Sequence, residues 1–177
     1  MGLSKVRTQS KSLWLIRHSE AENNPFKGRD LDRNLTQQGS QNSVKMRSWL
    51  NTLSHQPALF WVSAANRTIQ TAKLLSKNTS ARLIIEEALY LATAEELLDI
   101  LHYSPEEQPN IAIVAHNPGI NDLVNSLCNT YQLEALPPSG IAYFKLDCKW
   151  SEVSANKQYS VNSIFPGSGT KSLNEYP

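Results

Sequence analysis

The chain has 177 residues, of which 40% are hydrophobic and 19% are charged, and this length and composition suit one globular domain. Its formal net charge of +1 gives no overall field that would attract nucleic acid or a membrane surface, so an anionic substrate must be held by local charges. Two cysteines, Cys128 and Cys148, exclude a disulfide framework and favour a reduced, cytoplasmic setting. Residues 1–12 lack the apolar core of a secretory signal, and no segment reaches the length of a membrane span.

Apolar runs bounded by polar segments predict strands, and helically spaced apolar residues predict helices between them. The expected strands cover residues 12–17, 58–63, 82–86, 111–115, 141–147 and 160–165. The expected helices cover residues 37–53, 64–77, 94–103 and 119–129. Because strands alternate with helices, we predict an α/β fold, a three-layer α/β/α sandwich with a mainly parallel sheet and antiparallel pairing at one edge.

The pattern predicts one domain at residues 12–165, between a flexible lead-in at 1–11 and a flexible, Gly/Ser-rich tail at 166–177. No internal repeat or linker divides this domain. Residues 18–35 form a long polar loop after the first strand, and loops of this length in a compact domain tend to be functional.

Two of the expected strands run directly into a histidine. Arg17-His18 follows the apolar run at residues 13–16, and His116 follows the run at 111–115. Open α/β sheets bind ligands at the carboxyl ends of their strands, so we expect both imidazoles at one edge. An arginine beside a histidine suits phosphate chemistry, because guanidinium matches phosphate bidentately and a histidine nitrogen can attack phosphorus. Taken alone, either histidine is more often an ordinary polar residue at a strand end.

A third polar pattern, Ser63-x-x-x-Arg67-x-x-Gln70-Thr71-Ala72, follows the second strand and begins a helix. Arg67 falls in the first helical turn, where its charge opposes the helix dipole and an anionic ligand would offset that cost. By itself, Arg67 is better explained as a solvated arginine. The sequence shows no metal-type spacing, Walker loop, dinucleotide-type glycine motif or basic-aromatic run, so we predict no metal, no cofactor and no nucleic-acid partner.

Together these segments resemble the histidine phosphatase superfamily, whose fold is called phosphoglycerate mutase-like. The Arg-His-Gly motif of that family stands here as Arg17-His18-Ser19, and the family asparagine six residues beyond the histidine falls on Asn24. The family stretch G-x-x-D-x-x-L-T-x-x-G resembles residues 28–39, with one extra residue before the leucine. The S-x-x-x-R-x-x-Q-T-A motif matches residues 63–72, and the second family histidine matches His116.

Within the superfamily, the chain is similar to the short phosphohistidine-phosphatase, or SixA-like, branch. The similarity lies in residues 88–98, in His116-Asn117-Pro118-Gly119 and in residues 138–142. Mutases of the family carry a longer insert after the third strand, which covers the substrate, and residues 86–111 are too few to hold it. The resemblance therefore implies a comparatively open pocket.

The resemblance implies hydrolysis of a phosphomonoester or a phosphohistidine without a metal or cofactor. His18 would attack phosphorus and carry the phosphoryl group as phosphohistidine, while a backbone carbonyl fixes the tautomer of its ring. Arg17, Arg67 and His116 would surround the phosphate oxygens, and Asn24 would add a donor. The expected partner is a phosphorylated small molecule or a phosphohistidine protein, and no membrane is involved.

The sequence leaves the general acid and the effect of Ser19 open. We prefer Glu95 as the acid, in the first turn of an expected helix, although a plain first-turn glutamate explains it about as well. Glu20 and Glu22, in the loop after His18, are the other candidates. Ser19 replaces the family glycine, whose missing side chain lets the loop backbone approach phosphate closely. A phosphomutase and a phosphate-binding pseudoenzyme of the same fold are the alternative functions.

Overall fold

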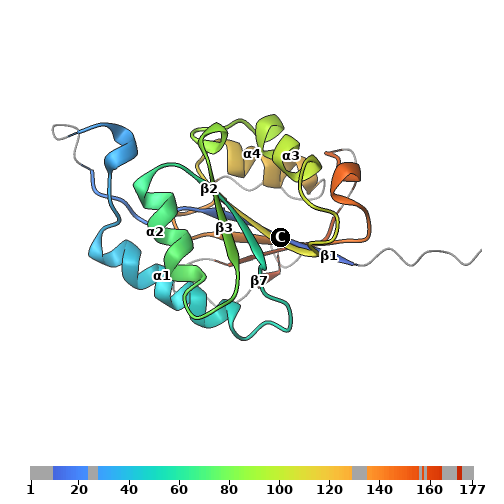
Figure 1. The fold of residues 1–177 in the computed structure, drawn as a ribbon, viewed down its shortest axis with the longest axis horizontal. Coiled ribbons are helices and arrows are strands. Elements are labelled where there is room, and N and C mark those ends of the chain that lie inside the picture. Colours follow the sequence, from blue (N-terminus) through green and yellow to red (C-terminus); the bar gives the residue numbers. More distant parts are fainter. Residues whose placement is uncertain are drawn as a thin grey trace, which may run out of the picture.

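The computed structural model describes residues 10–23, 28–128, 135–155, 157, 159–164 and 171–172. These residues form one mixed seven-stranded sheet in the order β3-β2-β4-β1-β5-β6-β7 (Figure 1). The strands are β1 (Lys11–Arg17), β2 (Leu59–Ser63), β3 (Arg82–Glu86), β4 (Asn110–Ala115), β5 (Ile141–Leu146), β6 (Val161–Ile164) and β7 (Lys171–Ser172). Strands β1 to β4 run parallel to one another, and β5, β6 and β7 continue the sheet in antiparallel pairs.

The helices lie on both faces of the sheet. They are α1 (Gln37–Leu50), α2 (Asn66–Leu75), α3 (Ala94–His102) and α4 (Gly119–Leu127). Figure 1 shows α1 and α2 on one side of the sheet and α3 and α4 on the other. The predicted three-layer α/β/α sandwich, with its mainly parallel sheet and antiparallel edge, is therefore confirmed.

Strand β1 contributes side chains to a separate core on each face of the sheet, because successive side chains of a strand point to opposite faces. Leu13 and Leu15 pack in one cluster with residues of α3 and α4. Trp14 and Ile16 pack in the other cluster with residues of α1 and α2. All four side chains are fully buried. A strand buried on both faces needs a continuous apolar run, which is the pattern that precedes Arg17 in the sequence.

The ends of some elements differ from the prediction. Helix α1 begins at Gln37 as expected, because the Thr36 hydroxyl accepts a hydrogen bond from the Gly39 amide at 2.9 Å, but it ends at Leu50 and not at residue 53. Helix α2 begins two residues later than expected, because Ala65 keeps an extended backbone before the first turn. Within the described residues, no helix combines the length and the apolar character needed to cross a membrane.

The sheet takes in two residues of the expected tail. Lys171–Ser172 form β7, which pairs with β6 through Asn162 and Ser163. The start of the chain behaves similarly, since β1 begins at Lys11, within the expected lead-in. Strand pairing therefore includes Lys11 and residues 171–172 in the sheet, although their polar composition predicted flexible ends. Residues 1–9, 165–170 and 173–177 lie outside the described part of the chain.

Candidate functional site

The ends of β1, β4 and β2 bring the predicted residues together. Because β1 and β4 are parallel and Arg17 pairs with Ala115, the next residue of each strand is a histidine at the same edge. The rings of His18 and His116 lie with their centroids 5.2 Å apart. Arg67, in the first turn of α2, places its Nη2 3.4 Å from Nδ1 of His116. The predicted meeting of two imidazoles and a buried guanidinium is therefore present in the structure.

His18 keeps one ring nitrogen free of protons. Its Nδ1 lies 2.7 Å from the carbonyl oxygen of Ser19, and a carbonyl only accepts, so Nδ1 carries the proton and donates. Burial lowers the pKa of His18 to about 4, and the positive charges of Arg67, Arg17 and Arg33 act in the same direction. The neutral ring therefore holds a lone pair on Nε2, as a nucleophile requires.

His116 has both ring nitrogens engaged. Its Nε2 lies 2.8 Å from the Ser63 hydroxyl, at the end of β2, and its Nδ1 faces Arg67. Because arginine has only hydrogens to offer, Nδ1 accepts, and Nε2 carries the proton and donates to Ser63. The ring is 2% exposed and meets Tyr90 edge to face at 5.6 Å between centroids. Burial lowers the pKa of His116 to about 3, helped by the charges of His18 and Arg67.

The two predicted arginines are anchored in the same way. Nη1 of Arg17 donates to the carbonyl of Leu136 at 2.8 Å, and Nη1 of Arg67 donates to the carbonyl of Asp30 at 2.7 Å. The Nε of each is buried and has no partner among the described residues. Leaving a buried donor unpaired costs about 1–3 kcal/mol. Nε belongs to the edge of guanidinium that grips phosphate or carboxylate bidentately, so both side chains fit an oxyanion.

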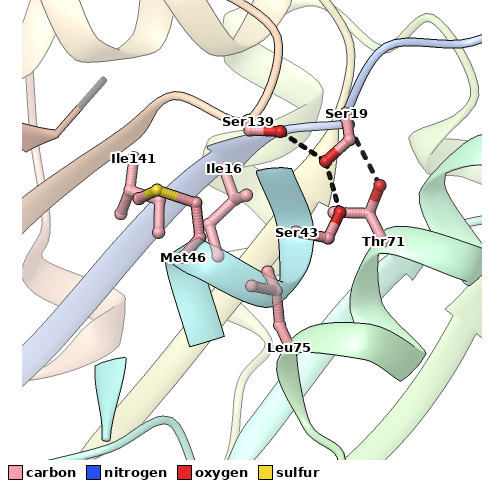
Figure 2. A pocket seen from close by; sticks show the side chains of 8 residues that line it. All are labelled: Ile16, Ser19, Ser43, Met46, Thr71, Leu75, Ser139 and Ile141. Atoms are coloured by element: carbon pink, nitrogen blue, oxygen red, sulfur yellow. Dashed lines mark hydrogen bonds between the residues drawn. The ribbon is translucent and has the colours of Figure 1, made fainter. Parts of the chain in front are cut away.

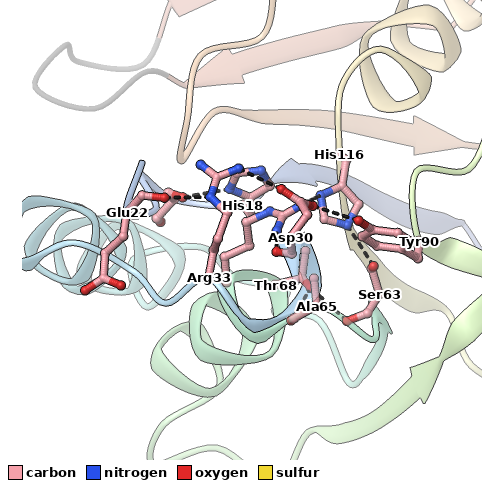
Figure 3. Close-up of polar contacts among 11 residues, drawn as sticks. His18, Glu22, Asp30, Arg33, Ser63, Ala65, Thr68, Tyr90 and His116 are labelled. Atoms are coloured by element: carbon pink, nitrogen blue, oxygen red, sulfur yellow. Dashed lines mark hydrogen bonds and ion pairs between the residues drawn. The ribbon is translucent and has the colours of Figure 1, made fainter. Parts of the chain in front are cut away.

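Asp30 and Arg33 join the site without having been predicted. The Asp30 carboxylate accepts from Tyr90 at 2.7 Å and from Arg33 Nη1 at 2.9 Å (Figure 3). It also accepts from Arg67 Nη2 at 2.8 Å. The hydroxyl of Tyr90, followed by the guanidinium of Arg33, holds the pKa of Asp30 well below its usual range. Both residues lie in the family-like stretch 28–39, which was the available signal. Their partners lie up to 60 residues away in sequence, so only the fold reveals the cluster.

The candidate acids do not join this cluster. Glu95 lies in the first turn of α3 and is exposed, and Glu20 and Glu22 are exposed as well. Among the described contacts, no carboxylate of these three reaches His18 or His116; Glu22 meets Arg33 only through its backbone carbonyl. Their role as general acid stays a prediction. Asn24, the predicted extra donor, lies outside the described residues.

Ser19, which stands at the family glycine, is fully buried. Its hydroxyl contacts the hydroxyls of Ser43 and Ser139, and its amide donates to Thr71 Oγ1 at 3.0 Å (Figure 2). The side chain thus bonds to hydroxyl groups of α1 and of the turn before β5, and the main-chain amide bonds to a hydroxyl group of α2.

A pocket of about 430 Å³ borders the cluster at Tyr90. It is lined by Arg29, Leu31, Asp32, Ala64, Asn66, Glu87 and Tyr90. In the described part of the chain, no group of three or more His, Cys, Asp or Glu side chains is arranged to hold a metal ion. The positive charge at the site comes instead from arginines.

Comparisons with known proteins give the family context. The sequence profile of the histidine phosphatase superfamily (branch 1) matches residues 13–90. Curated protein sequences give no match. The profile match covers most of β1 and the whole of α1, β2, α2 and β3, which include the motifs at residues 17–19, 28–39 and 63–72.

Solved structures extend the resemblance over nearly the whole chain. A SixA protein from Nakamurella multipartitia is 22% identical, with a TM-score of 0.78 over 90% of this chain and 98% of that chain. The protein histidine phosphatase SixA, in complex with tungstate, is 21% identical, with a TM-score of 0.73 over 88% and 97%. A mycobacterial glucosyl-3-phosphoglycerate phosphatase is 16% identical, with a TM-score of 0.65 over 90% and 100%. The shared fold confirms the phosphoglycerate mutase-like architecture.

Proposed function

We propose that this chain, which resembles the histidine phosphatase superfamily in sequence and fold, is a phosphatase that forms a phosphohistidine on His18. The observation that carries the proposal is the hydrogen bond from His18 Nδ1 to the Ser19 carbonyl at 2.7 Å, which leaves the Nε2 lone pair free at a site where Arg17 and Arg67 each keep a buried, unpaired Nε donor. A neutral imidazole next to unpaired guanidinium donors is what in-line attack on phosphorus requires.

In the first step, Nε2 of His18 attacks phosphorus, a nitrogen–phosphorus bond forms, and the bond to the leaving group breaks. The unpaired Nε donors of Arg17 and Arg67 would hold non-bridging oxygens, because they are fixed in advance by the carbonyls of Leu136 and Asp30. Donors that need no reorganisation during the reaction are the main catalytic contribution in phosphoryl transfer. In the second step, water attacks the phosphohistidine, releases phosphate and restores neutral His18.

His116 would support the phosphoryl group from the other side. Its Nδ1 accepts from Nη2 of Arg67 in the described structure, so an oxyanion between the two side chains would compete with Nδ1 for that donor. A dianion at this position raises the affinity of the ring for a second proton, which His116 could then donate to a phosphate oxygen while Nε2 stays on Ser63.

Phosphohistidine is the substrate class that the site fits best. Asp30 is held as a carboxylate by three donors, and hydrogen bonding to Asp30 raises the pKa of Tyr90, so neither is a ready proton donor. A phosphohistidine needs none at the reacting nitrogen, because its ring can leave as neutral imidazole when the other nitrogen is already protonated. An alkyl phosphoester lacks this advantage, and general acid catalysis contributes about 10²–10⁴-fold.

Solved structures with the same fold include complexes with phosphate-like oxyanions. The protein histidine phosphatase SixA was solved with tungstate, and the mycobacterial glucosyl-3-phosphoglycerate phosphatase was solved with vanadate. The names of these two proteins span a phosphohistidine protein and a phosphorylated small molecule, and both remain candidates for the partner of this chain.

The test is rapid-quench trapping with a ³²P-phosphohistidine peptide. We expect acid-labile label on the wild-type protein and none on His18→Ala. In steady state, we expect kcat/KM for the phosphohistidine peptide to exceed that for a phosphoserine peptide by about 10²-fold or more. If no label forms while inorganic phosphate still binds, the chain is a phosphate-binding pseudoenzyme and the phosphatase proposal is wrong.

A further inference from the structure

Ser19 does more than replace a glycine, because its side chain sits inside a closed network of hydroxyl groups. Figure 2 shows its hydroxyl between those of Ser43, from α1, and Ser139, from the turn before β5. All three serines are buried, with Ser19 and Ser43 completely so. The surrounding side chains leave no space for a water molecule. The three serines therefore depend on one another for hydrogen bonds.

The protons of this network can run in only one order. The Ser43 hydroxyl donates to the carbonyl of Gly39 at 3.0 Å, so it must accept from Ser19. Ser19 has then used its one proton and accepts from Ser139. A buried network in which every member is satisfied restricts its members to one arrangement.

The main chain of Ser19 is held as firmly as its side chain. Its amide donates to Thr71 Oγ1 at 3.0 Å, and the Thr71 hydroxyl donates to the carbonyl of Arg67 at 2.7 Å. The Ser139 amide donates to the carbonyl of His18 at 3.2 Å. The peptide between His18 and Ser19, directly before the carbonyl that bonds to His18 Nδ1, is thus held from α2 and from the turn before β5, and the side chain of Ser19 is held from α1 and from the same turn.

Helix α1 comes close to the loop backbone at Glu20, next to Ser19, because Gly39 has no side chain. A Cβ at Gly39 would lie 2.1 Å from the carbonyl oxygen of Glu20, so only glycine lets the helix touch the loop backbone. Ser43 follows one helical turn later, on the same face of α1, which places its hydroxyl against Ser19. The contact between Ser43 and Ser19 therefore depends on the close approach of α1 that Gly39 allows.

We propose that Ser19 is a positioning residue for His18. Its hydroxyl, locked between Ser43 and Ser139, fixes the carbonyl that receives the Nδ1 proton and so keeps the lone pair of His18 on Nε2. This inference rests on the proposed function, in which His18 is the nucleophile. Without the lock, the carbonyl is free to turn, and the ring gains access to the tautomer with its proton on Nε2, which cannot attack.

The first measurement needs no turnover. ¹⁵N-histidine NMR of the wild-type protein should show one tautomer of His18, protonated on Nδ1, and Ser19→Ala should show a mixture. Rapid-quench labelling should show His18 phosphorylation slowed by about tenfold in Ser19→Ala, with KM unchanged, because a small misplacement of a reacting group has effects of this order. Ser43→Ala removes the acceptor for the Ser19 proton and should act in the same direction if Ser19→Ala does not fold.

Ser48→Ala is the matched control, because Ser48 also lies on α1 and also donates to a backbone carbonyl one turn earlier, yet is exposed and outside the network. It should change neither the tautomer nor the labelling rate. A single Nδ1 tautomer in both Ser19→Ala and Ser43→Ala overturns the inference, even if labelling slows. Failure of the wild-type protein to take label would instead count against the proposed function. The NMR comparison would still test whether Ser19 sets the tautomer of His18, because it needs no turnover.

Discussion

The loops after β1 and β4 each begin with a histidine, but they hold it differently. His18 bonds to a backbone carbonyl through Nδ1, and no partner of its Nε2 is found among the described residues. His116 is held at both nitrogens, by a side-chain hydroxyl at Nε2 and by a guanidinium at Nδ1. A ring with a free lone pair can form a bond to phosphorus, whereas a ring held on both sides can only donate or accept hydrogen bonds.

This difference explains how two neighbouring imidazoles, with the pKa of both lowered by burial, can have separate roles. The position after β1 suits a nucleophile because the partner of His18 Nδ1 is a carbonyl oxygen. This oxygen only accepts, so the proton stays on Nδ1 and the lone pair stays on Nε2. The position after β4 suits the supporting role proposed for it, because Ser63 and Arg67 hold the ring at both nitrogens. Three experiments compare the two positions directly.

The largest effect is expected from the histidines themselves. His18→Ala should lower kcat by ~10³-fold or more, because it removes the atom that forms the covalent intermediate. His116→Ala should lower kcat by about 10²-fold and still allow label to accumulate on His18, because it removes one supporting donor. The measurement is rapid-quench labelling beside steady-state kinetics, with the exposed His55→Ala as control. Equal losses of label in both site variants would show that the two histidines are not distinct in role.

A smaller effect is expected from Arg67, which connects the two regions. Arg67→Ala should weaken vanadate binding by about tenfold to a hundredfold, since it removes a bidentate donor and leaves Asp30 with one partner fewer. Arg67→Lys should restore only part of the vanadate affinity, because lysine keeps the positive charge but lacks the planar guanidinium that binds an oxyanion through two hydrogen bonds. Vanadate titration measures both, and Arg82→Ala, an exposed arginine at the start of β3, is the control. Unchanged vanadate affinity in Arg67→Ala would remove it from the phosphate site.

The smallest effect on activity is expected from pH, which should act on the stability of the fold instead. Burial lowers the pKa of His18 to about 4 and that of His116 to about 3, whereas the unfolded chain takes up these protons near the ordinary value of about 6.5. The free energy of unfolding should therefore fall as pH drops from 6.5 to about 4, by up to about 3 kcal/mol for each histidine. Urea titrations across this range measure it, and His116→Asn should remove roughly half of the slope. A free energy of unfolding that does not change over this range would contradict the lowered pKa of both histidines. In kinetics, kcat/KM should fall only near pH 4, where His18 takes up a proton.

The sequence placed Arg17, His18 and His116 together, because each of them lies at the end of an apolar run or directly after it. Arg17, His18 and His116 end strands whose apolar runs are visible in the sequence, and parallel pairing then places them at one edge. The sequence could not place Asp30 or Arg33, since both come from a loop with no periodic pattern. It also favoured Glu95 as an acid from its place in a helix, and the described structure leaves that carboxylate exposed and without contact to either histidine.

By itself, the sequence determined the layers of the fold and the edge of the sheet at which Arg17, His18 and His116 meet. Apolar periodicity and the residues at strand ends are local properties of the chain, so both can be read from it. Only the tertiary structure decided which nitrogen of each histidine carries the proton, which donors hold Asp30, and how Ser19 takes the place of a glycine. These depend on contacts between residues up to 120 positions apart, such as that of Ser19 with Ser139. Hydrogen bonds are directional and short-ranged, so their partners are fixed only once packing has placed the atoms.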